Sequence, residues 1–244
     1  MFLVSSIIYL FYFAETINRL LVVQLFVFGH VLKLLLLLID FRAIIFKSFK
    51  FKFDFGFYKS GFSFFVLAGS GLLGSNIDLY LVNYFQSYTD LGVYQIAISY
   101  FIKIQAVATF ILVPFIKYLY RFSIKKTWKT SLYLGLTGMV LVPIGLVGCY
   151  FLLHDFYHLD LSYCFFVIGF FYIIPVYFYL PLVYHFYKKK QEKNVVIINF
   201  ISISINAFLN IIFIQYYGIS GALLASAIAS ISILLMYIYK LKKE

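Results

Sequence analysis

The residues of this chain that could do chemistry are ionisable side chains placed inside long apolar runs. Asp78 lies in the run 61–83 and Lys103 lies in the run 93–116, while His30 and Lys33 share one face of the run 20–39. An ionised side chain at the middle of a membrane-spanning helix costs about 2.5–3.5 kcal/mol on insertion scales, so such residues usually face a cavity or a partner. These four residues therefore predict a site that binds a proton, an ion or a polar ligand within a membrane.

Simpler interpretations exist for all of these side chains except Lys103. Asp78 stands about five residues from the outer end of its run, where partial hydration could explain it, although the face that it occupies argues for more. Lys103 stands ten residues into its run, about 15 Å from the outer end, which is too deep for its side chain to reach water. Lys33 is only about 10 Å from the inner end, where extension of its side chain to the cytoplasmic surface explains it equally well. His30 is as often a hydrogen-bonded packing residue as a proton carrier. Asp78 and Lys103 thus carry the functional prediction.

Small and polar residues form a stripe on each of three predicted helices. The stripes consist of Ala68, Gly71, Gly74, Ser75 and Asp78; of Gln95, Ser99 and Lys103; and of Asn199, Ser202, Asn206 and Asn210. Spacings of three, four and seven residues place the members of each stripe on one helix face. The stripe with Asp78 also fits a packing seam, because small residues let helices approach closely. We expect the polar sides to turn inward around a hydrated cavity, where Asp78 and Lys103 pair or share a polar ligand.

The elements that must position these residues are membrane-spanning helices. Apolar residues make up 64% of the chain, charged residues make up 12%, and the mean hydropathy is +0.98. A helix needs about 20 apolar residues to cross the hydrocarbon layer. We predict eight spans, the first of them short, at 2–14, 20–39, 61–83, 93–116, 131–153, 161–184, 195–215 and 219–239. The fold class is therefore all-α and polytopic, because spanning strands would alternate in character instead.

The distribution of Lys and Arg predicts the orientation of the chain. The segments 40–60, 117–130, 185–194 and the tail after residue 239 hold 17 of the 20 basic residues, and the loops 84–92, 152–160 and 216–218 hold none. Short loops rich in Lys and Arg stay cytoplasmic, so we expect a multi-pass protein of the cytoplasmic membrane with both termini inside. The net charge of +11 therefore mainly reflects the orientation of the chain in the membrane. A secondary effect is attraction of the basic residues to anionic lipid head groups. Nucleic-acid binding is a poor interpretation of the charge.

Metal and cofactor sites are not indicated by the sequence. The outer loop holds His154, Asp155, His158 and Asp160 at a spacing that matches no metal site, and a hydrated, hydrogen-bonded loop explains them. Cys149 and Cys164 are better explained by apolar packing than by a disulfide. We expect no cofactor.

Two segments resemble polysaccharide flippases of the multidrug/oligosaccharidyl-lipid/polysaccharide (MOP) exporter superfamily. In residues 57–101 an acidic residue late in one helix precedes a short outer loop and a G-x-Y-x-x-A-like entry, here Gly92, Tyr94 and Ala97. In residues 206–232 an Asn-rich helix leads into a YGI-x-GA turn, here Tyr217 to Ala222. The resemblance covers most of residues 50–240. The basic residue that often follows the acidic one is replaced here by Leu79.

The resemblance implies a fold and an activity. The fold would be a MATE-like bundle that lacks the first helices of the usual twelve, with residues 1–55 as the end of a first bundle and 56–244 as a six-helix C-terminal bundle. The activity would be bacterial transport of an undecaprenyl-diphosphate-linked oligosaccharide by alternating access, for O-antigen or related polysaccharide biosynthesis, without covalent chemistry. Asp78 would occupy the acidic position, and Lys103 would meet an anionic diphosphate or acidic sugar.

Three other functions stay open at this point. A cation-coupled multidrug exporter of the same superfamily would use Asp78 as its proton or sodium site. A membrane glycosyltransferase, acyltransferase or polymerase would need reactive residues on external loops, and only the 154–160 cluster offers them, so we expect no enzyme. A non-transporting partner in polysaccharide assembly, for instance of a polymerase, is the third. A chain with only eight spans would be an incomplete or partner-dependent flippase.

Overall fold

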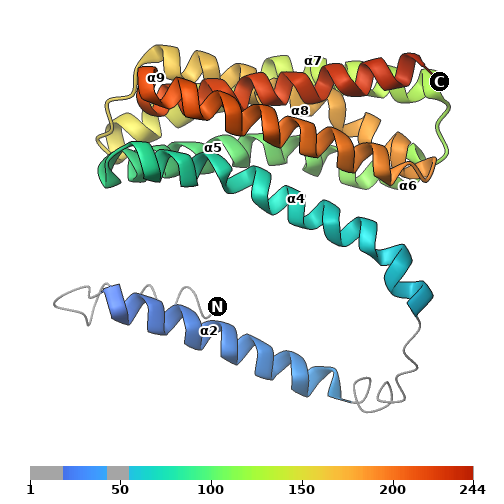
Figure 1. Ribbon diagram of the computed structural model, residues 1–244, viewed down its shortest axis with the longest axis horizontal. Helices are drawn as coiled ribbons and strands as arrows, with labels where there is room; N and C mark the ends of the chain where they lie inside the picture. The colour runs from blue at the N-terminus through green and yellow to red at the C-terminus, as the bar shows by residue number, and fades with distance from the viewer. Residues whose placement is uncertain (1–18, 43–54, 244) are drawn as a thin grey trace. The chain divides into compact units, whose positions relative to one another are not determined.

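The computed structural model describes residues 19–42 and 55–243, and in these ranges the chain is helical and holds no strand (Figure 1). The chain divides into two compact units, Met1–Phe55 and Gly56–Glu244. In the first unit, helix α2 spans Arg19–Asp40, which matches the predicted run 20–39. Its large apolar side chains are exposed from Val27 to Phe41, as expected of a helix that faces lipid or other helices. The predicted short span 2–14 lies outside the described residues.

The second unit contains the other helices. They are α4 (Phe55–Phe85), α5 (Tyr88–Leu112), the short α6 (Ile116–Leu119), α7 (Ile124–Phe151), α8 (Tyr163–Lys188) and α9 (Glu192–Lys242). A 3-10 turn over Val113–Phe115, which contains Pro114, joins α5 to α6. A π-helical turn over Leu152–Phe156 extends α7. Each predicted run from 61–83 onward therefore lies on a helix.

Four helical segments of the described residues are long and apolar enough to cross a membrane. They are Tyr88–Leu119, Ile124–Phe156, Tyr163–Lys188 and Glu192–Lys242. A spanning helix needs about 20 predominantly apolar residues, because each residue adds about 1.5 Å along the axis. These segments favour a membrane-embedded protein.

Helix α9 is broken at Gly218, where the backbone has φ 57° and ψ −136°. Glycine adopts this region without a steric penalty, so it is the residue that allows the chain to reverse. The two halves then lie side by side, and the Ser202 hydroxyl of the first half donates to the Ala229 carbonyl of the second over 3.2 Å. A Cβ atom at Gly221 would stand 2.1 Å from the Phe213 carbonyl oxygen, so the turn requires a second glycine. The predicted separation of 195–215 from 219–239 is confirmed.

Side chains of neighbouring helices donate to backbone carbonyls of α8 near its two prolines. A proline inside a helix removes one backbone hydrogen bond and opens the preceding turn. The Gln105 side chain donates to the Tyr172 carbonyl, three residues before Pro175, over 3.3 Å. The Ser131 hydroxyl donates to the Phe178 carbonyl, three residues before Pro181. These bonds link α8 to α5 and α7 in the turns that precede the prolines.

Glycines allow α5, α7 and α8 to pack closely. A Cβ atom at Gly138 of α7 would lie 2.7 Å from the Tyr177 ring, and one at Gly169 of α8 would lie 2.6 Å from the Phe101 ring. Since lipid tails are as apolar as the protein core, close packing of this kind is a main source of helix association in a membrane. Tyr177 and Phe101 are fully buried and anchor the core of the second unit.

The basic segments of the second unit meet at one end of the bundle. The Lys188 ammonium donates to the Phe122 carbonyl over 2.9 Å, which joins the end of α8 to the loop before α7. The Lys240 ammonium donates to the Asn194 side chain over 2.6 Å, which joins the end of α9 to its start. At the other end, Gln86 donates to the Ile214 carbonyl near the α9 break over 3.2 Å. The structure thus gathers positive charge at one end, as a consistent membrane orientation requires.

Candidate functional site

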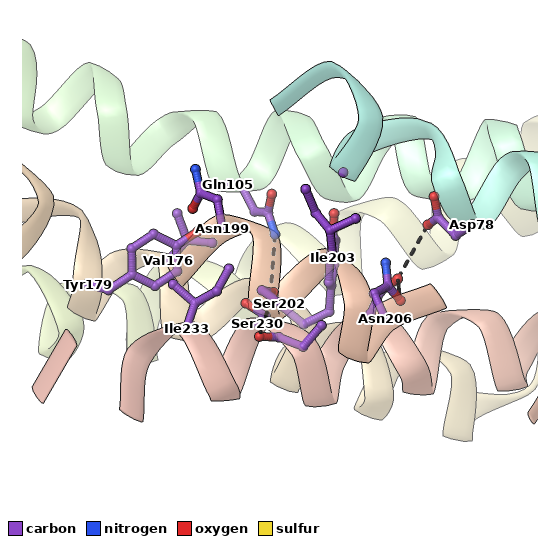
Figure 2. Close-up of a pocket in the computed structure, with 14 residues that line it drawn as sticks. Asp78, Gln105, Val176, Tyr179, Asn199, Ser202, Ile203, Asn206, Ser230 and Ile233 are labelled. Atoms are coloured by element: carbon purple, nitrogen blue, oxygen red, sulfur yellow. Dashed lines mark hydrogen bonds between the residues drawn. The ribbon is translucent and has the colours of Figure 1, made fainter. Parts of the chain in front are cut away.

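A cavity of about 260 Å³ lies among α4, α5, α8 and both halves of α9 (Figure 2). Most of its polar lining consists of amides and hydroxyls, and its only ionisable carboxyl group is that of Asp78. The lining residues are Gly74, Asp78, Gln105, Tyr172, Val176, Tyr179, Asn199, Ser202, Ile203, Asn206, Ser226, Ala229, Ser230 and Ile233. A polar cavity inside an apolar bundle is the arrangement that binds a polar solute.

Asp78 is 5% exposed and accepts hydrogen bonds from two other helices. The hydroxyl of Tyr94, at the start of α5, donates to Asp78 Oδ2 over 2.6 Å. The hydroxyl of Ser226, in the second half of α9, donates to the same oxygen over 3.3 Å. Salt bridges among the described residues do not include Asp78. The backbone N–H of Leu79 donates to Asp78 Oδ1 over 3.1 Å. A buried carboxylate is costly unless it is paired or neutralised, and these three neutral donors supply only part of that stabilisation.

Amide oxygens of α9 complete a cluster around Asp78. Asn206 Oδ1 lies 3.4 Å from Ser226 Oγ and accepts a bond of 2.8 Å from the Asn210 amide. Asn210 is fully buried, and its own Oδ1 has no hydrogen-bond partner in the described part of the chain. A buried polar atom without a partner costs about 1–3 kcal/mol. The cluster therefore presents oxygen atoms from a carboxylate, two amides and a hydroxyl, which are ligands that hard cations prefer.

The other part of the cavity carries neutral hydrogen-bonding groups. Figure 2 shows Asp78 and Asn206 toward one end and Tyr179 and Asn199 toward the other. Gln105 is held in place by its bond to the Tyr172 carbonyl. Among the lining residues of this cavity there is no Lys or Arg. The arrangement therefore suits a neutral polar group, such as a sugar, better than a diphosphate.

The sequence-predicted residues divide into those that the cavity brings together and those that it does not. Asp78, Asn199 and Asn206 line the cavity, and Asn210 is bonded to Asn206. Gln95 is exposed on α5 and does not line the cavity.

Lys103 does not lie beside Asp78. It borders a separate cavity of about 280 Å³ with Tyr100, Gly145 and Cys149, and its ammonium is 4.1 Å from the centre of the Tyr100 ring. Lys103 follows Tyr94 by nine positions, which is about two and a half helical turns. The two side chains therefore lie on opposite sides of α5. The expected approach of Lys103 to Asp78 is therefore not present in the structure, and the stripe with Gln95 and Ser99 does not line the Asp78 cavity.

His30 and Lys33 are exposed on α2 in the first unit. In the second unit, the outer cluster forms a surface contact in which His154 Nδ1 lies 2.7 Å from Asp155 Oδ1 and His154 Nε2 lies 3.7 Å from Asp160 Oδ1. Cys149 is buried, Cys164 is exposed, and both thiols are free.

The prediction from sequence missed Gln105, Ser226 and the two cavity tyrosines, Tyr172 and Tyr179, as site residues. A signal for two of them exists. Gln105 follows Tyr94 by eleven residues, which is about three turns, so both lie on one face of α5. Ser226 and Ser230 repeat at an interval of four in the second half of α9, as the asparagines do in the first half.

The bundle and its polar cavity define the class of this chain, a membrane-embedded α-helical protein with a polar site between its helices. Comparison of the chain with protein-family models, with curated proteins and with solved structures gave no match.

Proposed function

We propose that this chain is a cation-coupled membrane transporter that moves an undecaprenyl-diphosphate-linked oligosaccharide across the cytoplasmic membrane by alternating access. The observation that carries the proposal is the buried Asp78 carboxylate, which lines a polar cavity among four helices and forms no salt bridge with any residue that the structure describes. The two sequence segments that resemble MOP flippases contribute Asp78, Tyr94 and Asn206 to this region, and Gly218 to the turn that brings the second half of α9 back to it. The eight-span topology with both termini cytoplasmic is part of the proposal.

The coupling step follows from the charge of the site. Asp78 receives hydrogen bonds from Tyr94 and Ser226, but neither neutralises it. A proton or a sodium ion bound among Asp78, Asn206 and Ser226 would do so, because their oxygen atoms lie within hydrogen-bond distance of one another. Binding of the cation then stabilises one conformation of the bundle over the other, which is how an ion gradient drives a conformational equilibrium.

The substrate follows from the neutral part of the cavity. Amides such as Gln105 and Asn199 and hydroxyls such as Ser230 pair well with sugar hydroxyls, and the Tyr179 ring offers a flat apolar face. A cavity of about 260 Å³ is smaller than typical ligand pockets, so it holds part of a head group while the polyprenyl tail stays in lipid. Lys103, on the opposite side of α5, is a candidate partner for the diphosphate at a place separate from the sugar cavity.

A cation-coupled drug exporter of the same superfamily is the second candidate. It is favoured by one observation, the presence of a carboxylate and two tyrosine rings, Tyr172 and Tyr179, in one cavity. Amphiphilic cations bind to carboxylates and over aromatic rings.

Substrate competition separates the two candidates. The purified chain would be placed in liposomes that contain a fluorescent lipid-linked oligosaccharide, and movement of the label between leaflets would be measured by chemical quenching. We expect movement that an excess of unlabelled lipid-linked sugar slows and that an amphiphilic cation does not slow. The reverse pattern would favour the drug exporter. A folded chain that moves neither substrate would overturn both, and would favour a partner in assembly.

A further inference from the structure

A second groove of the bundle, which shares no lining residue with the Asp78 cavity, lies between the start of α7 and the end of α9. It has a volume of about 220 Å³ and is lined by Ile124, Lys125, Trp128, Ile238, Leu241 and Lys242. Figure 1 shows the end of α9, marked C, near the loop that leads into α7. Each helix contributes one lysine and at least one large apolar side chain, so the groove has an apolar floor and two positive charges.

The charges of this groove have no partner within the described chain. Lys125 and Lys242 are exposed and take part in no salt bridge among the described residues. The residues from Ile124 to Lys129 carry three lysines and no carboxylate, so the groove lysines are available to an anion from outside the chain. The lysines sit at the basic end of the bundle, where the orientation proposed above places the cytoplasmic head groups.

The remaining lining residues identify the kind of anion. Trp128, 36% exposed, is the only tryptophan of the chain, and tryptophan is enriched at the level of lipid head groups. Leu241 is 9% exposed and Ile238 is partly buried, so the groove continues from the charged rim onto apolar side chains. A ligand that fits must carry a negative group and a long apolar chain. Basic pockets between helices on the cytoplasmic side bind anionic lipid head groups in this way.

We propose that this groove is a binding site for an anionic phospholipid of the cytoplasmic leaflet. Lys125 and Lys242 hold the phosphate, and Trp128, Ile238 and Leu241 contact the acyl chain. Bound in this way, the lipid bridges the start of α7 and the end of α9, two elements separated by more than 100 residues of sequence.

Trp128 is the single tryptophan of the chain and lines the groove, so its fluorescence reports on lipid bound there. The chain would be reconstituted in phosphatidylcholine vesicles that contain an equal fraction of either brominated phosphatidylglycerol or brominated phosphatidylcholine, and quenching of the Trp128 emission would be compared. Each lysine near a membrane surface favours an anionic lipid by about fivefold. We expect at least a fivefold preference for the brominated phosphatidylglycerol in the unmodified chain.

A matched pair of variants tests whether the groove itself makes the difference. The Lys125→Ala/Lys242→Ala variant removes the two groove lysines, whereas Lys126→Ala/Lys243→Ala removes two neighbouring exposed lysines that do not line it. We expect the preference to fall below about twofold in the first variant and to stay within about twofold of the unmodified value in the second. Equal quenching by the two lipids in the unmodified chain, or an equal loss in the two variants, would overturn the proposal.

Discussion

The hydrogen bond from Tyr94 to Asp78 is the contact on which the geometry of the site most depends. Tyr94 is fully buried, and its hydroxyl lies 2.6 Å from Asp78 Oδ2. The substitution Tyr94→Phe removes this donor with the smallest possible change of shape, since the ring stays in place. Asp78 Oδ2 would then keep only the longer bond from Ser226, at 3.3 Å.

The expected interaction energy between Tyr94 and Asp78 follows from two ranges measured for other hydrogen bonds. Hydrogen bonds to charged groups contribute about 1.5–3 kcal/mol in proteins. Side-chain hydrogen bonds between membrane helices contribute less, about 0.6 kcal/mol on average and about 1.7 at most, because the unfolded chain in the membrane also finds partners. Tyr94 and Asp78 are buried and on different helices, so we expect an interaction energy near the upper membrane value, about 1.5 kcal/mol.

A double-mutant cycle measures this energy. Free energies of unfolding would be compared in mixed micelles for the unmodified chain, Tyr94→Phe, Asp78→Ala and the double variant, because the cycle isolates the term that the two residues share. Tyr133→Phe serves as the control, since Tyr133 is 65% exposed, and it should change the free energy of unfolding by less than about 0.5 kcal/mol. A coupling energy below about 0.5 kcal/mol would refute the contact and with it the buried cluster.

Three further predictions concern packing and exposure. The substitution Gly135→Ala places a Cβ atom 2.2 Å from an α8 ring and should cost about 1–3 kcal/mol of unfolding free energy, whereas Gly148→Ala, with no atom within 4 Å, should cost under about 0.5 kcal/mol. Equal costs would contradict the close α7–α8 packing. Gly218→Ala forces a side chain into the backbone conformation at φ 57° and should cost about 1–3 kcal/mol by the same measurement; a neutral result would contradict the break in α9. A maleimide should label the exposed Cys164 well before the buried Cys149, as read by mass spectrometry, and equal labelling would contradict the burial of Cys149.

The helices of this chain were predictable because a single physical constraint dominates them. Lipid accepts no unpaired backbone groups, so a long apolar run must become a helix, and its ends follow from the polar residues that flank it. The break between the last two helices was equally predictable from the glycines of the YGI-x-GA turn. In the structure, Gly218 has a positive φ and Gly221 lies against the backbone of Phe213. Asp78, Asn199 and Asn206 were found because a polar side chain is expensive in an apolar run.

The inward side of α5 was not predictable by the same reasoning. The stripe of Gln95, Ser99 and Lys103 is the most polar side of that helix, yet the side that packs into the bundle carries Tyr94, Ala97 and other apolar or aromatic residues. In water, polarity distinguishes the outside of a helix from the inside. In a membrane both sides are apolar, so polarity alone does not tell a cavity from a lipid-facing groove that contains a lysine.

Ser226 was missed for a different reason. Its role depends on the reversal of the chain at Gly218, which brings the second half of α9 against Asp78 on α4, 148 residues earlier in the sequence. Serine is common as a small packing residue in membrane helices, so its type gives no indication of a site. Its interval of four from Ser230 indicates a shared helix face, but only the tertiary arrangement places that face beside Asp78.

The central claim is that the Asp78 cluster couples a cation to transport, and the dependence of transport on an ion gradient tests it most directly. Liposomes that contain the chain and a fluorescent lipid-linked oligosaccharide would be given a sodium gradient, a proton gradient or neither, with Asp78→Asn and the exposed control Asp155→Asn measured beside the unmodified chain. We predict that one of the two gradients accelerates movement of the lipid in the unmodified chain and in Asp155→Asn, and that Asp78→Asn abolishes this acceleration. Gradient-driven movement that persists in Asp78→Asn, or that is lost equally in both variants, would contradict the account.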